Sequence, residues 1–451
     1  MARSRTTWRC QQCGYGAPKW LGRCPDCGEF GSFVEESAPA GVSGAGSADA
    51  RPRAVTRLAD VVTEDGQRIL TGIAEFDRVL GDGLVRGSVV LIGGEPGIGK
   101  STLLLQAAGR LGDSGVPVLY VCGEESLQQV RSRADRIGAK DGVALLPEVD
   151  VTAVEATVLA ERPGVVIVDS VQTLFDPALD GVPGSVGQVR ATAARLVRLA
   201  KTHDVTLIVV GHVTKDGTIA GPRVLEHVVD TVLYFEGDAD HAFRIVRAAK
   251  NRFGSVSEIG IFEMTGTGLA EVGQPSGLLL AQRARGVAGS AVMATMEGSR
   301  PLLVEVQALV SPSYLPAPRR LSVGVDSSRL LQVLAVLERR AGIALGSYDV
   351  YVSVVGGIRV AEPAVDLPLA LALASSKTDR PLPDGCVSFG EVGLTGDVRA
   401  VPHTDARVRE ARRMGLERAI VPDPQGRALP DGAIPVSTLS EAIGNVCGTD
   451  R

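Results

Sequence analysis

The stretch that decides the fold is VVLIGGEPGIGKS, residues 89–101. Its first four residues are apolar and branched, which is typical of a β-strand buried on both faces. A glycine-rich loop, G-x-x-x-x-G-K-S, follows at residues 94–101 and leads into a helical segment over residues 102–111. Strand, glycine loop and helix in this order form a cradle of backbone N–H groups for phosphate oxygens. The sequence therefore predicts a nucleoside triphosphate site.

Two side chains of this loop have predicted roles. Lys100 neutralises the outer phosphates, and the Ser101 hydroxyl binds Mg²⁺. Asp169 follows the apolar residues 165–168, and a carboxylate at the end of such a strand holds the water shell of Mg²⁺. The alternative for Asp169 is a cap of the following helix. The predicted nucleotide-binding residues are Gly94, Glu95, Pro96, Gly97, Ile98, Gly99, Lys100, Ser101, Thr102 and Asp169.

Polar residues also follow two other apolar runs, at residues 116–121 and 206–210. After the first, Glu124 is the predicted base for the attacking water, with Glu125 left open as the alternative. Acidic residues in the first turn of a helix are the simpler explanation for both. After the second run, His212 is a candidate sensor of the γ-phosphate, although a surface histidine without a catalytic role is the alternative.

Apolar runs continue at residues 231–235 and 244–248 and alternate with amphipathic segments, which indicates an α/β domain with a mostly parallel sheet. Beyond residue 268 the pattern changes to α+β. Strand-like stretches are expected at 302–309 and 350–354, and helices at 328–341, 368–376 and 405–414. We predict an ATPase domain over residues 57–268 and a second domain over 269–451.

The N-terminal segment contains two C-x-x-C pairs, formed by Cys10, Cys13, Cys24 and Cys27. Four thiolates at this spacing predict a tetrahedral Zn²⁺ site in a miniature domain over residues 1–36. Its first 30 residues hold five basic and two acidic side chains, so a DNA-facing role and a protein-docking or structural role both remain open. Residues 37–56 are rich in Ala, Gly, Ser and Pro, which predicts a flexible linker.

Composition narrows the class of protein further. At 451 residues the chain is too long for one core, and a net charge of −5 excludes a uniformly basic nucleic-acid coat. No apolar run approaches the roughly 18 residues of a membrane span. With no secretory signal and an odd number of cysteines, we expect a cytoplasmic protein without membrane association or a disulfide framework.

Lysine is rare here: only seven of the 47 basic residues are Lys. One of them opens the pentapeptide Lys-Asn-Arg-Phe-Gly at residues 250–254. Lys250 and Arg252 are two residues apart on a strand that we place at the edge of the sheet, so both side chains point to one face and can reach one anion. An ordinary solvated basic turn is the alternative.

These motifs together resemble the RadA family of bacterial DNA repair proteins, also called Sms, which is related to the RecA recombinase. The resemblance rests on the four cysteines, the glycine loop, residues 120–126 and 169–173, and above all residues 250–254. It implies a RecA-like P-loop ATPase core between a Cys₄ zinc finger and a Lon-protease-like α+β domain. ATP, Mg²⁺ and Zn²⁺ are the implied cofactors.

The same resemblance implies a DNA-damage function. The expected activity is a single-stranded-DNA-stimulated ATPase that drives branch migration of recombination intermediates. The expected assembly is a ring, a hexamer, in which Lys250 and Arg252 act on the γ-phosphate held by a neighbouring subunit. The expected partners are single-stranded and branched DNA and a RecA-type recombinase, with DNA running along residues 176–190 and 215–223.

The C-terminal domain departs from the Lon proteases. Asp366 aligns with their nucleophilic serine and Asp405 with their lysine base, and a carboxylate pair cannot replace that dyad. We therefore expect no peptidase activity, and both aspartates are alternatively helix caps. Two other functions stay open: an ATP-driven Lon-type protease and a non-motor ATP switch or clock-like scaffold.

Overall fold

The computed structural model describes residues 6–10, 15–26, 28, 30–37, 57, 68–139, 142–212, 225–237, 243–281, 283–356, 358–426 and 428–447. The chain divides into two compact units. The first contains Met1–Ala239 and Phe243–Glu271, and the second contains Asp240–Ala242 and Val272–Arg451. Except for Ser37, which ends a strand, the predicted linker lies outside the described residues.

A small antiparallel sheet forms the N-terminal segment. Its strands are β1 (Thr6–Cys10), β2 (Gly16–Ala17) and β3 (Phe33–Ser37), in the order β2-β1-β3. Among the residues described in this segment, the buried core is very small and consists of Cys10, Ala17, Cys24 and Phe33. So little apolar surface rarely stabilises a fold without a metal or another cross-link.

The large sheet of the first unit has the order β12-β11-β10-β9-β4-β8-β7-β5-β6. The strands from β9 to β6 are parallel, and β10, β11 and β12 extend the sheet in antiparallel fashion, so the predicted mostly parallel sheet is confirmed. The strands are β4 (Val89–Gly94), β5 (Val118–Cys122), β6 (Val143–Leu146), β7 (Val165–Asp169), β8 (Thr206–His212), β9 (Thr231–Glu236), β10 (Phe243–Asn251), β11 (Ile259–Thr265) and β12 (Gly268–Glu271).

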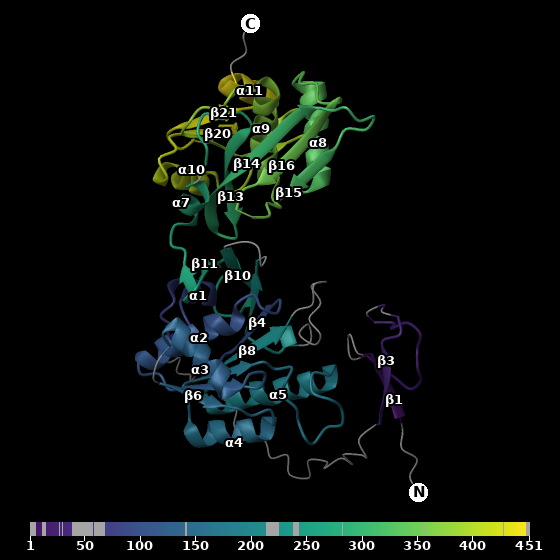
Figure 1. Ribbon diagram of the computed structural model, residues 1–451, viewed down its shortest axis with the longest axis vertical. Helices are drawn as coiled ribbons and strands as arrows, with labels where there is room; N and C mark the ends of the chain where they lie inside the picture. Colours follow the sequence, from purple (N-terminus) through teal and green to yellow (C-terminus); the bar gives the residue numbers. More distant parts are fainter. Residues whose placement is uncertain are drawn as a thin grey trace. The chain divides into compact units, whose positions relative to one another are not determined.

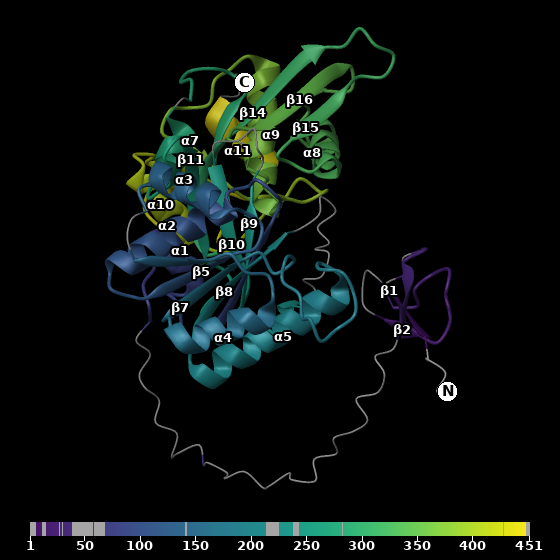
Figure 2. The same cartoon turned by 60° about the horizontal axis from the view of Figure 1, so that its bottom comes forward.

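Helices cover both faces of this sheet, which is why its strands are continuously apolar. Alternate residues of each central strand enter one of two cores: Ile167 packs in the core on one face and Val168 in the core on the other. Figures 1 and 2 show α1, α2 and α3 on one face and α4 and α5 on the other. The helices are α1 (Ala74–Leu80), α2 (Lys100–Asp113), α3 (Leu127–Ile137), α4 (Val151–Glu161) and α5 (Val186–His203).

The second unit is built on a mixed sheet of order β15-β16-β14-β13-β17-β20-β21, with α9 packed on β13 and β14 and with α8 and α11 packed against α9. Among the described ranges, no helix is long and apolar enough to span a bilayer. The elements are α7 (Pro275–Leu280), β13 (Ser290–Glu297), β14 (Arg300–Pro312), β15 (Arg320–Val323), α8 (Ser327–Arg340), β16 (Tyr348–Val354), α9 (Asp366–Thr378), β17 (Cys386–Ser388), β18 (Glu391–Val392), β19 (Val398–Arg399), α10 (Thr404–Arg413), β20 (Arg418–Pro422), β21 (Ala433–Val436) and α11 (Leu439–Cys447).

The two aspartates at the Lon-dyad positions have different surroundings. Asp366 is buried at the start of α9, where Nη1 of Arg329 lies 2.9 Å from both carboxylate oxygens and the Val392 N–H donates to Oδ2 at 3.1 Å. Asp405 is exposed in the first turn of α10. The N-caps of the two helices are Val365 and His403, so the helix-cap alternative is wrong for both aspartates.

Arg407 is the largest fully buried side chain of the second unit. Its guanidinium makes a bidentate pair with Glu362, with Nη1 2.8 Å from Oε1 and Nη2 2.6 Å from Oε2, and also donates to the Ala294 carbonyl at 2.6 Å. Burial raises the pKa of Glu362, but the bonds and charge of Arg407, together with bonds from the Met296 N–H and the Thr295 hydroxyl, outweigh it and lower the pKa of this carboxyl. The pair connects α10 to the segment that leads into α9.

Replacing Arg407 with methionine should destabilise the protein by ~3 kcal/mol, because it leaves Glu362 without its charged partner in a largely buried place. Urea denaturation of the full chain followed by far-UV circular dichroism measures the change. Arg399→Met is the matched control: Arg399 pairs with Asp397, but its side chain is 56% exposed, so its replacement should change the stability very little. Equal losses in the two variants would contradict a stabilising role for the buried pair.

Candidate nucleotide site

Four neighbouring strands bring the predicted catalytic side chains together. β4, β8, β7 and β5 are adjacent and parallel, so their carboxyl ends lie at one edge of the sheet. Gly94 at the end of β4 is paired with His212 at the end of β8, and Asp169 at the end of β7 is paired with Cys122 at the end of β5. Glu124 follows Cys122 by two residues. The edge therefore gathers the glycine loop, two carboxylates and a histidine.

The glycine loop closes on its own lysine. Gly97 and Gly99 have φ angles of 77° and 119°, in the left-handed region that side chains other than glycine disfavour, and Gly99 is the N-cap of α2. Lys100 is buried, and its Nζ donates to the carbonyls of Gly94 at 2.7 Å and Glu95 at 2.8 Å. Burial lowers the pKa of Lys100 to about 8, against the opposite effect of the nearby carboxylates.

Asp169 is buried and bonded to an aromatic hydroxyl. Oη of Tyr120 on β5 donates to Oδ2 of Asp169 at 2.6 Å, and Tyr120 is only 1% exposed. Burial, together with the charge of Asp169, raises the pKa of Tyr120 well above its usual value, so the phenol stays protonated as a donor. This bond fixes the orientation of one carboxylate oxygen and leaves Oδ1 available to a ligand.

The two adjacent glutamates have separate partners. Oε1 of Glu124 accepts a hydrogen bond from the Ser170 hydroxyl and lies 2.9 Å from Nε2 of His212. The bond with His212 is the main reason that the pKa of Glu124 is lowered. Glu125 instead makes a bidentate ion pair with Arg133 of α3. Only Glu124 is thus directed to the edge that carries the glycine loop.

The residues present fit a magnesium nucleotide. Nδ1 of His212 and both amide atoms of Gln172 are buried and have no hydrogen-bond partner among the described residues. Unsatisfied polar groups of this kind are costly unless a ligand or water meets them. Ser101 and Asp169 supply the hydroxyl and carboxylate oxygens that Mg²⁺ prefers, and the loop supplies N–H donors for phosphate.

Arg252 is level with the start of β4, and Lys250 with its middle. Arg252 donates its backbone N–H to the Asp230 carbonyl, and Asp230 donates its own to Val89, the first residue of β4. Lys250 is level with the middle of β4. At ~3.3 Å per residue, the three strand positions from there to Gly94 separate Lys250 from the loop by ~10 Å along the strand.

Both cations contact the turn that precedes β9. Nζ of Lys250 donates to the carbonyls of Glu226 at 2.6 Å and Val229 at 2.7 Å, and Nη1 of Arg252 lies 3.3 Å from Oδ1 of Asp230. Burial, and secondarily Arg252, lower the pKa of Lys250. The predicted edge location is wrong, because β10 lies between β9 and β11, and Arg252 follows the last residue of the strand.

The predicted DNA-contacting loops are only partly described. Residues 215–223 lie outside the described residues. In the other segment the loop ends at Ser185, and residues 186–190 form the first turns of α5, so the prediction of a loop over all of 176–190 is wrong. Asp176 is buried and pairs with Arg195 at 3.1 Å, which fixes the start of this loop against α5.

Two of the four predicted zinc ligands are described. Cys10 and Cys24 are 0% and 1% exposed in the small N-terminal core. Each lies next to a tight backbone turn. The Cys10 N–H donates to the Tyr15 carbonyl, and the Gly28 N–H donates to the Cys24 carbonyl. Cys13 and Cys27 lie outside the described residues. Buried thiols at the start of two C-x-x-C turns suit a tetrahedral Zn²⁺, which would cross-link a core too small to stabilise itself.

Two residues of the nucleotide site had no predicted role. Tyr120 is the one aromatic side chain in the apolar strand β5, and a buried tyrosine hydroxyl needs an acceptor, which is the signal that points to Asp169. Ser170 directly follows Asp169, and the contact with Glu124 depends on the spacing of neighbouring strands rather than on a local pattern.

Comparison with known proteins adds independent observations. A family model described as an AAA domain matches residues 52–218, and one described as a rubredoxin metal binding domain matches residues 8–35. DNA repair protein RadA of Bacillus subtilis is 46% identical over 452 residues, covering 98% of this chain and 99% of that protein. DNA repair protein RadA of Pseudomonas aeruginosa is 52% identical over 426 residues, covering 94% of each chain.

Among solved structures, a KaiC-like protein from Pyrococcus horikoshii aligns with a TM-score of 0.39 and 21% identity, over 46% of this chain and 99% of that one. The family matches confirm the predicted order of fold types, in which a metal-binding ribbon precedes an ATPase core.

Proposed function

Because the chain belongs to the RadA family of DNA repair proteins, we propose that it is an ATP-driven motor whose ATPase is stimulated by single-stranded DNA and which drives branch migration of recombination intermediates. The ATPase assignment itself follows from the family and the AAA domain. The observation that carries the motor proposal is that Arg252 is level with the start of β4 and Lys250 with its middle, so both are separated along the strand from the glycine loop of their own subunit. A site completed by these cations requires two subunits.

Within one subunit, the loop residues hold the triphosphate. Lys100 exchanges the carbonyls of Gly94 and Glu95 for the outer phosphates, a charge-assisted interaction that its present partners cannot match. Ser101 and Asp169 would hold Mg²⁺, which supplies positive charge next to the transferred phosphoryl group. Tyr120 keeps the Asp169 carboxylate oriented for this role.

Glu124 is the proposed base. Its low pKa keeps it ionised, the state that accepts a proton from the attacking water. His212 bonds the same carboxylate oxygen and directly precedes residues 213–224, so contact with the γ-phosphate through its second ring nitrogen would connect the nucleotide state to the chain that follows. Ser170 holds Glu124 from the other side.

Lys250 and Arg252 are proposed to act on the phosphate held by a neighbouring subunit in a ring, a hexamer. The Arg252 side chain is 56% exposed, and Lys250 would exchange two backbone carbonyls for phosphate oxygens. Stabilisation of the transition-state charge by a cation supplied in trans is a known device of phosphoryl transfer. Hydrolysis then depends on assembly.

The remaining parts of the proposal concern partners and domains. We assign residues 1–36 to a Zn²⁺-binding finger with Cys10, Cys13, Cys24 and Cys27 as ligands, 57–268 to the ATPase domain and 269–451 to the Lon-like domain. Single-stranded and branched DNA are the proposed substrates, and a RecA-type recombinase is the proposed protein partner. The ion pair of Asp366 with Arg329 argues against a peptidase, because it occupies the carboxylate at the nucleophile position.

Glu124→Gln tests the motor with a matched neighbour, Glu125→Gln. The assay follows a labelled three-strand DNA intermediate with and without ATP. We expect strand extension by the unaltered protein with ATP, a loss of at least ~100-fold in Glu124→Gln because the base is absent, and activity within about threefold of normal in Glu125→Gln. Binding to the intermediate should weaken steeply as salt is raised.

Three results would contradict this proposal. Extension by Glu124→Gln at the normal rate would exclude its role as base. An ATPase rate unchanged by single-stranded DNA would favour a non-motor switch. ATP-dependent cleavage of a protein substrate that is lost in Asp366→Ala would favour a protease.

A further inference from the structure

The sheet of the second unit has an uncovered face at one end. Along β14, residues 302–306 are all buried, so both faces are covered there, but Gln307 and Leu309 are exposed. The neighbouring strands continue this face in register, because Leu309 is paired with Tyr351 and Tyr351 with Leu321. In the next row of this face, Ser353 is paired with Gln307 on one side and with Val323 on the other.

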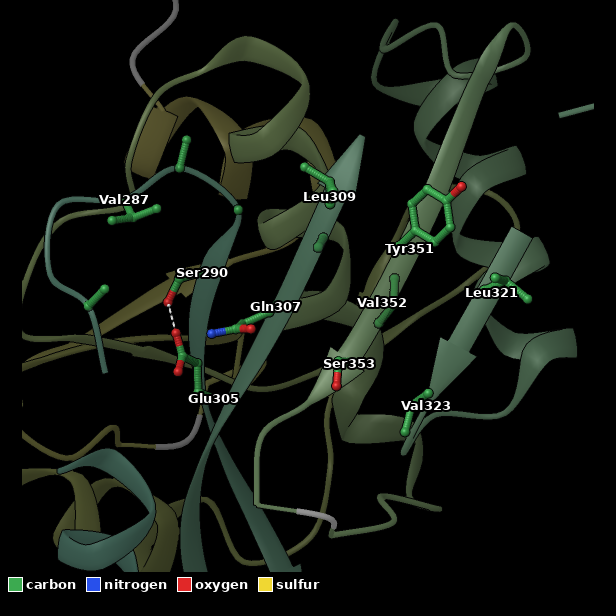
Figure 3. A pocket seen from close by; sticks show the side chains of 14 residues that line it. Val287, Ser290, Glu305, Gln307, Leu309, Leu321, Val323, Tyr351, Val352 and Ser353 are labelled. Carbon is green, nitrogen blue, oxygen red and sulfur yellow. Dashed lines mark hydrogen bonds between the residues drawn. The ribbon is translucent and has the colours of Figure 1, made fainter. Parts of the chain in front are cut away.

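A groove of about 500 Å³ lies on this face. Figure 3 shows that side chains of β14, β15 and β16 line it together with Val287 from the segment before β13. Its rim is apolar and open to solvent: Leu309, Leu321 and Val323 are 60%, 56% and 63% exposed, and Val287 is 52% exposed. Such a cluster of exposed apolar side chains is typical of an interaction surface.

A carboxylate lies at the base of the groove. Glu305 is 3% exposed, and Oε1 accepts a hydrogen bond from the Ser290 hydroxyl at 2.5 Å (Figure 3). Its second oxygen has no partner among the described residues. The guanidinium of Arg283 contacts Ser290 at 3.3 Å and makes no ion pair with Glu305. Glu305 lines the groove, and a carboxylate at the base of an apolar groove is a favourable partner for a cation.

We propose that this groove binds an extended segment of a partner protein that places an arginine or lysine side chain against Glu305, with apolar side chains two positions before and after it. Charge complementarity selects the cation, and the apolar rim accommodates its aliphatic stem and the flanking side chains. Neither the nucleotide site nor the positions of the Lon dyad include any of these residues.

The spacing of the rows favours an extended chain as the occupant. Glu305, Gln307 and Leu309 are two residues apart along β14, a repeat of roughly 6.6 Å. An extended peptide presents alternate side chains with the same repeat, so apolar, cationic and apolar side chains at positions i, i+2 and i+4 match the groove.

Fluorescence anisotropy with the full chain tests the proposal. The probe is a fluorescein-labelled peptide with the core Leu-Ser-Arg-Ser-Leu, and the matched control peptide carries citrulline, a neutral isostere, in place of arginine. We expect the arginine peptide to bind with a Kd on the order of 10 µM and the citrulline peptide at least about tenfold more weakly. In Glu305→Gln this preference should vanish, while Val323→Ser should weaken both peptides by a similar factor.

Controls separate folding and self-association from recognition. The ATPase rate and the thermal unfolding midpoint of both variants should match those of the unaltered protein. Equal binding of the two peptides to the unaltered chain, or a preference that persists in Glu305→Gln, would overturn the proposal. A smaller oligomer of Leu309→Ser in sedimentation velocity would also overturn it, because the groove would then be occupied by a second copy of this chain.

Discussion

Lys100→Ala is expected to lower ATP affinity by more than about 100-fold and to remove ATP turnover. The lysine is buried beside the carboxylates of the site and is directed to the loop carbonyls, so no other described cation is placed to meet the outer phosphates there. Loss of two charge-assisted bonds to phosphate accounts for an effect of this size. Titration with a fluorescent ATP analogue measures the affinity, and phosphate release measures turnover.

Lys377→Ala is the control, because this lysine belongs to the second unit, where its Nζ lies over the Tyr348 ring. It should leave affinity and turnover within about twofold of normal. Retention of tight nucleotide binding by Lys100→Ala would show that the triphosphate is held elsewhere.

Lys250→Ala should lose turnover but keep nucleotide affinity, whereas Lys100→Ala should lose both. Nucleotide affinity should stay within about twofold, because Lys250 is far from the loop of its own subunit, while turnover should fall by about 1000-fold, as when a cation supplied in trans is lost. Lys201→Ala is the matched control. Lys201 also contacts the turn before β9, through Asp230 at 2.6 Å, so a purely structural role of Lys250 would give both variants the same phenotype.

A mixing experiment separates action in trans from action in cis. Lys100→Ala lacks the phosphate lysine but keeps Lys250, and Lys250→Ala has the reverse arrangement. Combined in one assembly, they should recover part of the turnover, because some junctions pair an intact loop with an intact Lys250. No recovery above the sum of the two separate rates would refute the trans assignment, as would equal losses of nucleotide affinity in both variants.

The central sheet was predictable because its strands are buried on both faces and so appear as uninterrupted apolar runs. The arrangement of strand ends followed from the parallel pairing, and it brought Asp169 and His212 next to the glycine loop as expected. The sequence pattern alone could not decide whether Glu124 or Glu125 is the base. The choice depends on how the turn after β5 directs two adjacent side chains, one to Ser170 and one to Arg133.

The prediction that Lys250 and Arg252 lie at the edge of the sheet failed for a specific reason. β11 alternates apolar and small or polar residues, and β12 is a four-residue strand containing Gly268 and Glu271, so neither carries the apolar run that identified the other strands. Both lie beyond β10, so β10 is an interior strand of the sheet. The ion pairs of Asp366 with Arg329 and of Glu362 with Arg407 were also hidden, because each joins residues tens of positions apart that no local pattern relates.

Asp230 has a consequence for how a ring of such subunits would work. Its carboxylate accepts the N–H of Val89 and pairs with Lys201 and Arg252 at once. Val89 starts the strand whose far end is the glycine loop. If Arg252 turns toward an adjoining subunit, Asp230 loses one of the three donors that position it. ATP hydrolysis in one subunit would then be coupled mechanically, through β4, to the glycine loop of the adjoining subunit that supplies Arg252.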